Sequence, residues 1–218
     1  MTARKAPATE LRPTGRRVED FSDAVFAIVI TITVLEVRIP GSLAFADDPV
    51  ALQAFMAELI TYALSFIVIA NLWTSHHYLL FTLTMPTRAT LWLNNHLLFW
   101  VTLLPIATHF LGAFPYSPRA CAVYGFAGVG VTSAFSVLRA HGARIAHSDL
   151  HRQIHRRVLK RTWVFIAIYA ASIPLAFVNI WLAWACFVAV PPMFIVPIIR
   201  ADLTADRDAH QDLGRSCP

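Results

Sequence analysis

Long apolar stretches separated by short polar segments are the main pattern in this chain of 218 residues. A helix needs about 20 mostly apolar residues to cross a bilayer, and six stretches approach or exceed that length. The spans that we predict run over residues 18–39, 54–82, 89–114, 119–138, 162–178 and 180–199. Pro105 lies inside the third span and predicts a kink or a break in it. The pattern therefore predicts an all-α polytopic membrane protein with one six-span domain over residues 17–200.

The positive charges are divided unequally between the two sides of this arrangement. Six spans place both termini on one side, and that side holds all of the 18 Lys and Arg residues except Arg38 and Arg119. Cytoplasmic loops carry an excess of Lys and Arg, so both termini are predicted to be cytoplasmic. We expect residues 1–16 to be a disordered cytoplasmic tail and residues 201–218 a cytoplasmic C-terminal tail. Residues 139–161 are predicted to be a solvated linker or helix extension at anionic headgroups.

The composition agrees with a membrane protein and argues against other classes. Hydrophobic residues make up 57% of the chain and charged residues only 14%, whereas soluble domains average about 25% charged residues. The net charge of +5 lies in segments between apolar runs, so it indicates topology, and no nucleic-acid partner is expected. The three cysteines are scattered without a CxxC spacing, so neither a disulfide nor a metal site is predicted.

The first span combines an apolar stripe with a carboxylate. At 100° per residue, Phe21, Ile28, Ile32 and Leu35 share one face with Thr31 beside it, whereas Asp23 lies roughly 140° from Ile28. An ionisable residue inside a span is expensive in lipid, so the segment is a candidate functional site. The stripe has two interpretations, which are packing or lipid contact and an apolar pore constriction that gates by dewetting. The second interpretation requires several copies of the chain around a symmetry axis.

The ends of this span also allow two interpretations. Arg17 and Asp23 lie roughly 120° apart around the helix, so each is expected to brace the helix through partners on other helices rather than to pair directly. Direct contact with a permeating ion is the alternative. His76, on the second span, is a candidate hydrogen-bond partner for Ser22 and Asp23. We predict Trp73, His76 and Asn95 as the partners of this segment.

The sequence around these residues resembles a known family. Arg17-x-x-x-Phe21-Ser22-Asp23, followed by a Thr-x-x-x-Leu-Glu ending, is similar to the signature of the transmembrane protein 175 family of potassium-permeable channels. The resemblance continues at Trp73-x-x-His76 and at Leu104-Pro105, and it covers the six spans. The single six-span unit is similar to that of bacterial members, which implies a bacterial plasma membrane.

This resemblance implies a fold and a mechanism. It implies a homotetramer in which the first helix of each subunit lines a central pore. Ile28 would form the constriction, Thr31 a layer of hydroxyls, and Ile32 and Leu35 further pore-lining positions. The motif from Arg17 to Asp23 would hold the pore helix against the second and third spans. The implied activity is a potassium leak with modest selectivity over sodium, and with no cofactor besides the permeant ion.

Two other functions remain open at this point. A proton-coupled transporter, or a proton-permeable pathway, could use Asp23 and the histidines of the spans. An intramembrane metalloenzyme could use His76, His77, His96 and His109, but these residues lack the spacing of metal ligands. The sequence therefore predicts a channel rather than an enzyme.

Overall fold

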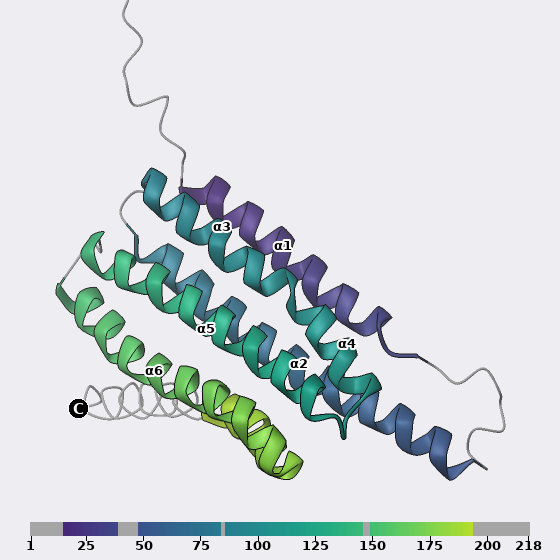
Figure 1. Cartoon of the computed structure of the whole chain (residues 1–218). Coiled ribbons are helices and arrows are strands. Elements are labelled where there is room, and N and C mark those ends of the chain that lie inside the picture. The colour runs from purple at the N-terminus through teal and green to yellow at the C-terminus, as the bar shows by residue number, and fades with distance from the viewer. Residues whose placement is uncertain (1–14, 39–47, 84–85, 146–148, 194–218) are drawn as a thin grey trace, which may run out of the picture.

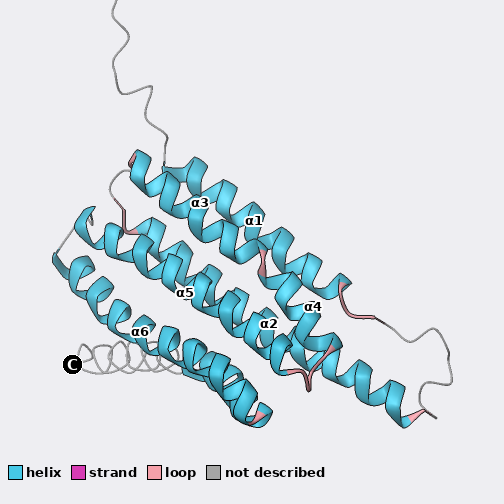
Figure 2. Cartoon of the chain, viewed as in Figure 1, coloured by secondary structure: helices cyan, strands magenta, loops and turns pink. Residues whose placement is uncertain are grey.

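The computed structural model describes residues 15–38, 48–83, 86–145 and 149–193, with side chains from residue 155 onward and at residue 153 in the last range. Regular structure in these residues is helical (Figure 2). The labelled helices are α1 (Gly15–Leu35), α2 (Pro49–Phe81), α3 (Arg88–Thr102), α4 (Leu104–Ala113), α5 (Pro118–Ile145) and α6 (Asp149–Val178). A shorter apolar helix, Ile180–Met193, follows α6. The prediction of an all-α protein is confirmed.

Four stretches are long and apolar enough to cross a membrane, and they correspond to four of the predicted spans. They are Pro49–Phe81, Arg88–Ala113, Pro118–Ile145 and His155–Val178. Helix α1 has 21 residues, or about 31 Å at 1.5 Å per residue, but its N-terminal half carries three carboxylates. The predicted sixth span begins as Ile180–Met193, and residues 194–199 lie outside the described ranges, as do residues 1–14 and 201–218.

The third span is broken where proline was expected to interrupt it. Helix α3 ends at Thr102 and α4 begins at Leu104, so that Pro105 occupies the first turn of α4. Proline has no N–H to donate, and its ring excludes the carbonyl four residues earlier, so it is tolerated in a first turn but not in a helix interior. The expectation of a break at Pro105 is confirmed.

Helix α5 is the interior helix of the bundle. It packs against α3, α4 and α6, and Figure 1 shows it between α3 and α6. Glycines permit this close approach, because a Cβ on Gly128 would collide with the ring of Tyr169, and one on Gly130 with the ring of Trp100. Small residues let helices in lipid approach closely. These two glycines therefore set the contacts of α5 with α6 and α3.

The basic segment 139–161 is largely helical rather than a loop. Helix α5 continues to Ile145 and α6 begins at Asp149, so the helix-extension interpretation of this segment holds for most of it. Arg139 is buried rather than solvated. Its guanidinium donates to the Ser75 carbonyl at 3.1 Å, lies 3.4 Å from Nδ1 of His155, and sits 4.7 Å from the ring centroid of Phe135. This arginine therefore fastens α5 to α2 and α6.

Helix α1 lies on one edge of the bundle. It contacts α2, α3 and α4, and in Figure 1 it lies beside α3 on the side of the bundle away from α6. Its buried residues are spaced three or four apart along one face, as for a helix that packs along a single side. The opposite face of α1 is left uncovered by its own chain.

Candidate functional site

The uncovered face of α1 is the predicted apolar stripe. Phe21, Ile28, Ile32 and Leu35 have exposed fractions of 57%, 55%, 41% and 80%, and Thr31 is also exposed. The opposite face is buried and consists of Val18, Ser22, Phe26, Val29 and Thr33. Exposed apolar surface of this kind faces lipid, another subunit or a pore.

Thr31 is the hydroxyl within this stripe. Its Oγ1 lies 2.9 Å from the carbonyl oxygens of both Ala27 and Ile28, so the hydroxyl donates back to its own helix. A threonine hydroxyl has one hydrogen and two acceptor lone pairs. Because the hydrogen is directed at the backbone, lone pairs remain for a cation on the exposed side. Thr31 can therefore serve as an oxygen ligand without disturbing the helix.

A buried chain of polar side chains fixes the other face of α1. Asn94, from α3, donates through Nδ2 to Oγ of Ser22 at 2.9 Å, and its Oδ1 lies 2.7 Å from Nε2 of His76 on α2. The hydroxyl of Ser22 in turn donates to the Val18 carbonyl at 2.8 Å. All three side chains are at most 1% exposed. One asparagine thus joins α1, α2 and α3.

The donor and acceptor roles of these three side chains follow from the orientation of the Asn94 amide. Because Nδ2 of Asn94 donates to Ser22, its Oδ1 must accept, so Nε2 of His76 carries the hydrogen. Nδ1 of His76 is then an acceptor, and it is buried with no hydrogen-bond partner in the described structure. An amide between a hydroxyl and an imidazole does not pass a proton readily, so this geometry favours bracing over a proton relay.

Asp23 is held by α2 rather than by a cation. Nε1 of Trp73 donates to Oδ1 of Asp23 at 2.8 Å, which places the carboxylate on the side of α1 away from the stripe. Arg17 and Phe21, assigned by sequence to the same bracing motif, are exposed. Among the described residues neither Arg17 nor any other Lys or Arg forms an ion pair with a carboxylate. Bracing within the subunit is therefore visible for Ser22 and Asp23 only.

Asn95 was named from the sequence as a partner of the motif, and the structure gives that position to Asn94. Asn95 is exposed, because adjacent residues of a helix point about 100° apart.

The sequence also gave no role to Glu19, whose Oε1 lies 2.9 Å from Nδ1 of His77. At the other end of α1, Oε2 of Glu36 lies 3.3 Å from Nδ1 of His109. Each end of the helix thus has a histidine–carboxylate pair.

The four histidines considered for a metalloenzyme do not form one site. His76 is hydrogen-bonded to Asn94, whereas Nδ1 of His77 and Nδ1 of His109 lie within ion-pair distance of carboxylates at opposite ends of α1, and His96 is exposed. The group of described residues whose ligand atoms lie close enough together to hold a metal ion contains one of these histidines, His77, together with Glu19 and Asp23.

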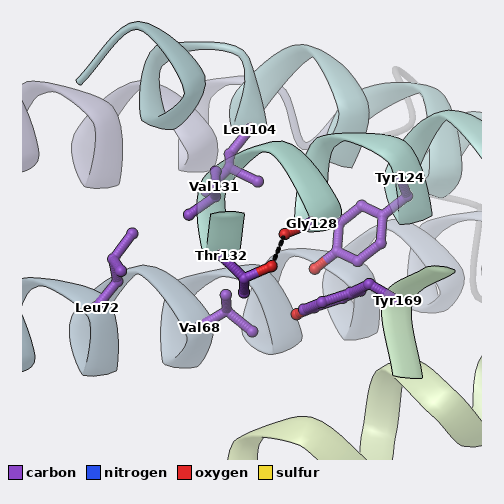
Figure 3. Close-up of a pocket in the computed structure, with 8 residues that line it drawn as sticks. All are labelled: Val68, Leu72, Leu104, Tyr124, Gly128, Val131, Thr132 and Tyr169. Atoms are coloured by element: carbon purple, nitrogen blue, oxygen red, sulfur yellow. Dashed lines mark hydrogen bonds between the residues drawn. The ribbon is translucent and has the colours of Figure 1, made fainter. Parts of the chain in front are cut away.

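A small pocket lies where α2, α4, α5 and α6 meet. It is lined by Val68, Leu72, Leu104, Tyr124, Gly128, Val131, Thr132 and Tyr169 (Figure 3). Both tyrosine hydroxyls point toward Thr132 (Figure 3), whose own hydroxyl donates to the Gly128 carbonyl at 2.7 Å. The pocket has a volume of about 20 Å³, which is enough for one water molecule. The pocket is a packing gap rather than an ion pathway.

Apolar membrane-length helices, a polar brace and an uncovered stripe with a hydroxyl define a polytopic membrane protein in which one face of α1 is left uncovered by its own chain. Residues 17–105 match the family described as endosomal/lysosomal potassium channel TMEM175. The chain is 32% identical to a potassium channel of Chryseobacterium sp. (strain P1-3) over 194 residues, covering 87% of this chain and 96% of that protein. The chain belongs to the TMEM175 family, which is a family of ion channels.

Other relatives fall into two groups. A potassium channel of Chamaesiphon minutus is 29% identical over 192 residues, covering 83% of this chain and 93% of that protein. The human endosomal/lysosomal proton channel TMEM175 is 33% identical over 116 residues, which are 47% of this chain and 22% of that protein. Bacterial relatives are thus named potassium channels and animal relatives proton channels.

Solved structures agree on the fold. The crystal structure of a lysosomal potassium-selective channel TMEM175 homolog from Chamaesiphon minutus superposes with a TM-score of 0.72 at 24% identity, covering 84% of this chain and 97% of that one. The crystal structure of a variant of the potassium channel MtTMEM175, in complex with a nanobody–MBP fusion, superposes with a TM-score of 0.58 at 18% identity. The match covers 89% of this chain and 93% of that one.

Proposed function

We propose that this protein is a potassium-permeable leak channel, with modest selectivity for potassium over sodium, whose pore is lined by α1. The observation that carries the proposal is the stripe of Ile28, Thr31, Ile32 and Leu35, which its own chain leaves uncovered. One helix cannot enclose a pore, so several copies of the chain must surround it. The tetramer that the family resemblance implies would place four stripes around a common axis. Potassium channels among the relatives support this assignment.

The proposed mechanism follows from the side chains of the stripe. Ile28 forms an apolar neck that a hydrated cation enters only by losing water, which makes the neck both a barrier and a filter. Thr31 lies one turn further along and offers hydroxyl oxygens that replace part of the lost hydration. Potassium holds its water less tightly than sodium, so the combination favours potassium. Ile32 and Leu35 continue the apolar lining.

The proposed setting is a bacterial plasma membrane with both termini in the cytoplasm. The bacterial relatives support the choice of membrane, and the asymmetry of Lys and Arg supports the orientation. The partners in this proposal are the other three subunits, potassium ions and membrane lipid. No cofactor and no nucleic acid are part of it.

Reconstitution tests the proposal directly. Purified protein in liposomes loaded with potassium is expected to release potassium faster than protein-free liposomes, and the same protein is expected to pass sodium more slowly. Mass measurement of the particle in detergent is expected to give four times the 24.3 kDa of one chain. Potassium release equal to that of protein-free liposomes would refute the channel, and a monomeric or dimeric particle would refute the four-fold pore.

A proton pathway is the second candidate, and the names of the animal relatives favour it. The same liposomes distinguish the two functions when potassium is replaced by an impermeant cation and a pH gradient is applied. Proton flux without potassium flux would refute the proposed potassium channel and support a proton pathway. Because Asn94 separates Ser22 from His76, we expect little proton flux along that buried chain.

A further inference from the structure

Three side chains that can bind a metal meet at the N-terminal end of α1. Glu19 and Asp23 lie one helical turn apart on α1, and His77 faces them from α2. One ligand atom from each lies within 4.8 Å of the other two, and the His77–Glu19 distance is 2.9 Å. At metal–ligand distances of about 2.1 Å, tetrahedral zinc ligands lie roughly 3.4 Å apart. Small side-chain rotations therefore bring all three atoms onto one ion.

The surroundings of the cluster hold its members in place. Trp73 donates to Oδ1 of Asp23 at 2.8 Å, and its ring centroid lies 5.9 Å from that of His77. A ligating carboxylate that also accepts a hydrogen bond is the usual arrangement in metal sites, because the second bond orients the ligand. Trp73 thus fixes the carboxylate and contacts the imidazole of the same cluster.

The charge of the cluster is not balanced by a cationic side chain. Glu19 and Asp23 place two carboxylates on adjacent turns, and among the described residues no Lys or Arg forms an ion pair with either. Both are half-buried, as the side chain of His77 is. Two like charges at this distance repel each other, and a divalent cation relieves that repulsion.

The pair at the opposite end of α1 provides an internal contrast. Glu36 and His109 also lie within contact distance, at 3.3 Å, but among the described residues no third ligand joins them in a metal-binding group. Two protein ligands bind a transition metal far more weakly than three. The end of α1 that carries the family motif therefore has the only three-ligand group in the described part of the chain.

We infer that Glu19, Asp23 and His77 bind a divalent transition metal, with Zn²⁺ as the best fit, and that the bound ion lowers potassium flux. One imidazole and two carboxylates match the ligand preference of zinc, and a water completes the tetrahedron. Binding joins α1 to α2 and cancels two negative charges in each subunit near one entrance of the proposed pore. The site itself stands on geometry alone, and its effect on flux rests on the proposed function.

Zinc binding is measured first, without reference to transport. Titration of the full-length protein in detergent with zinc chloride, followed by calorimetry, is expected to show one site per chain. His77→Gln and Glu19→Gln are expected to weaken binding by more than about 100-fold, since loss of an outer-shell partner alone costs 10–100-fold. His109→Gln is the matched control, because it removes a histidine from a pair that lacks the third ligand. Elution of each variant at the wild-type volume in gel filtration establishes folding.

Flux in zinc-treated liposomes then tests the consequence. Wild type and His109→Gln are expected to lose potassium flux as zinc is added to both sides, whereas His77→Gln and Glu19→Gln keep it. No zinc binding by wild type, or binding that survives both variants, would overturn the site. Zinc-insensitive flux in a zinc-binding wild type would overturn the regulation. Zinc binding by a protein that passes no potassium would leave the site standing and refute the proposed channel.

Discussion

The two faces of α1 distribute polar and apolar groups in the reverse of a soluble helix. The buried face holds Ser22 and Thr33 among its apolar residues, whereas the uncovered face is formed largely by bulky apolar side chains. Ser22 is tied into a hydrogen-bonded chain that crosses three helices, and Thr31 on the other face bonds only to its own backbone. The buried face therefore holds α1 in place, and the uncovered face is the one that we propose to line the pore.

This division has a physical cause. In lipid the hydrophobic effect does not drive helices together, so packing and interhelical hydrogen bonds specify which face of a helix turns inward. A polar buried face therefore orients α1 more reliably than an apolar one. Once that face is fixed, the opposite stripe points in a defined direction without contacts of its own. Changes on the two faces are then expected to have separable effects.

The largest effect is expected on the buried face. Asn94→Leu breaks two interhelical hydrogen bonds, each worth up to about 1.7 kcal/mol in membrane proteins, so we expect a loss of about 2–3 kcal/mol of stability. Thermal unfolding in detergent measures this loss. Asn95→Leu is the control, because Asn95 is exposed on the next position of the same helix. Equal destabilisation by both changes would mean that the buried chain does not fix α1.

The next effect is expected on the stripe. Ile28→Asn places an amide in the proposed apolar neck, which water then enters, so we expect potassium flux to rise about tenfold, equivalent to 1.4 kcal/mol of barrier. Liposome flux measures it. Val34→Asn provides the control, because Val34 is also exposed but lies about 120° from Ile28 around the helix. A rise in both variants, or in neither, would remove the pore assignment from this stripe.

A smaller effect on stability is expected at Trp73. Trp73→Phe keeps the aromatic contact but removes the hydrogen bond to Asp23, at a cost of about 0.6 kcal/mol, the average for such bonds in a membrane protein. A small decrease in melting temperature with unchanged ion selectivity would agree with this role. Trp92→Phe, at an exposed tryptophan of α3, should have no effect. Altered selectivity in Trp73→Phe would place Asp23 in the pathway instead.

The smallest effect is expected at the hydroxyl of the stripe. Thr31→Val keeps the shape of the side chain but removes its oxygen, so we expect the potassium-to-sodium flux ratio to fall by about twofold to threefold, or roughly 0.5 kcal/mol. The ratio of flux rates in matched liposomes measures this change. Thr33→Val makes the same chemical change on the buried face and should leave the ratio unaltered. An unchanged ratio in Thr31→Val would exclude the hydroxyl from selectivity.

Four of the six spans and the break at Pro105 could be predicted because each depends on local sequence. The stripe of α1 was also predictable, since a helix has a fixed angle per residue. The partners on other helices were harder, because the register between two helices depends on packing along their whole length. An error of one residue separates Asn95 from Asn94, and the pairing of Glu19 with His77 left no signal in the spacing. The motif resemblance, not periodicity, is what singled out α1 as the proposed pore helix.

The spacing of the uncovered positions has a consequence for the shape of the proposed pore. Phe21, Ala24, Ile28, Thr31 and Leu35 are exposed and alternate steps of three and four, a repeat of 3.5 residues. A straight helix has 3.6 residues per turn, so a stripe of this period drifts about 20° per seven residues, and straight helices turn it toward a common axis only near the point where they cross. In the proposed tetramer, four such helices would cross near the middle of the repeat, at Ile28, and diverge toward both ends. The proposed pore would then have the shape of an hourglass, narrowest where the four Ile28 side chains surround the axis.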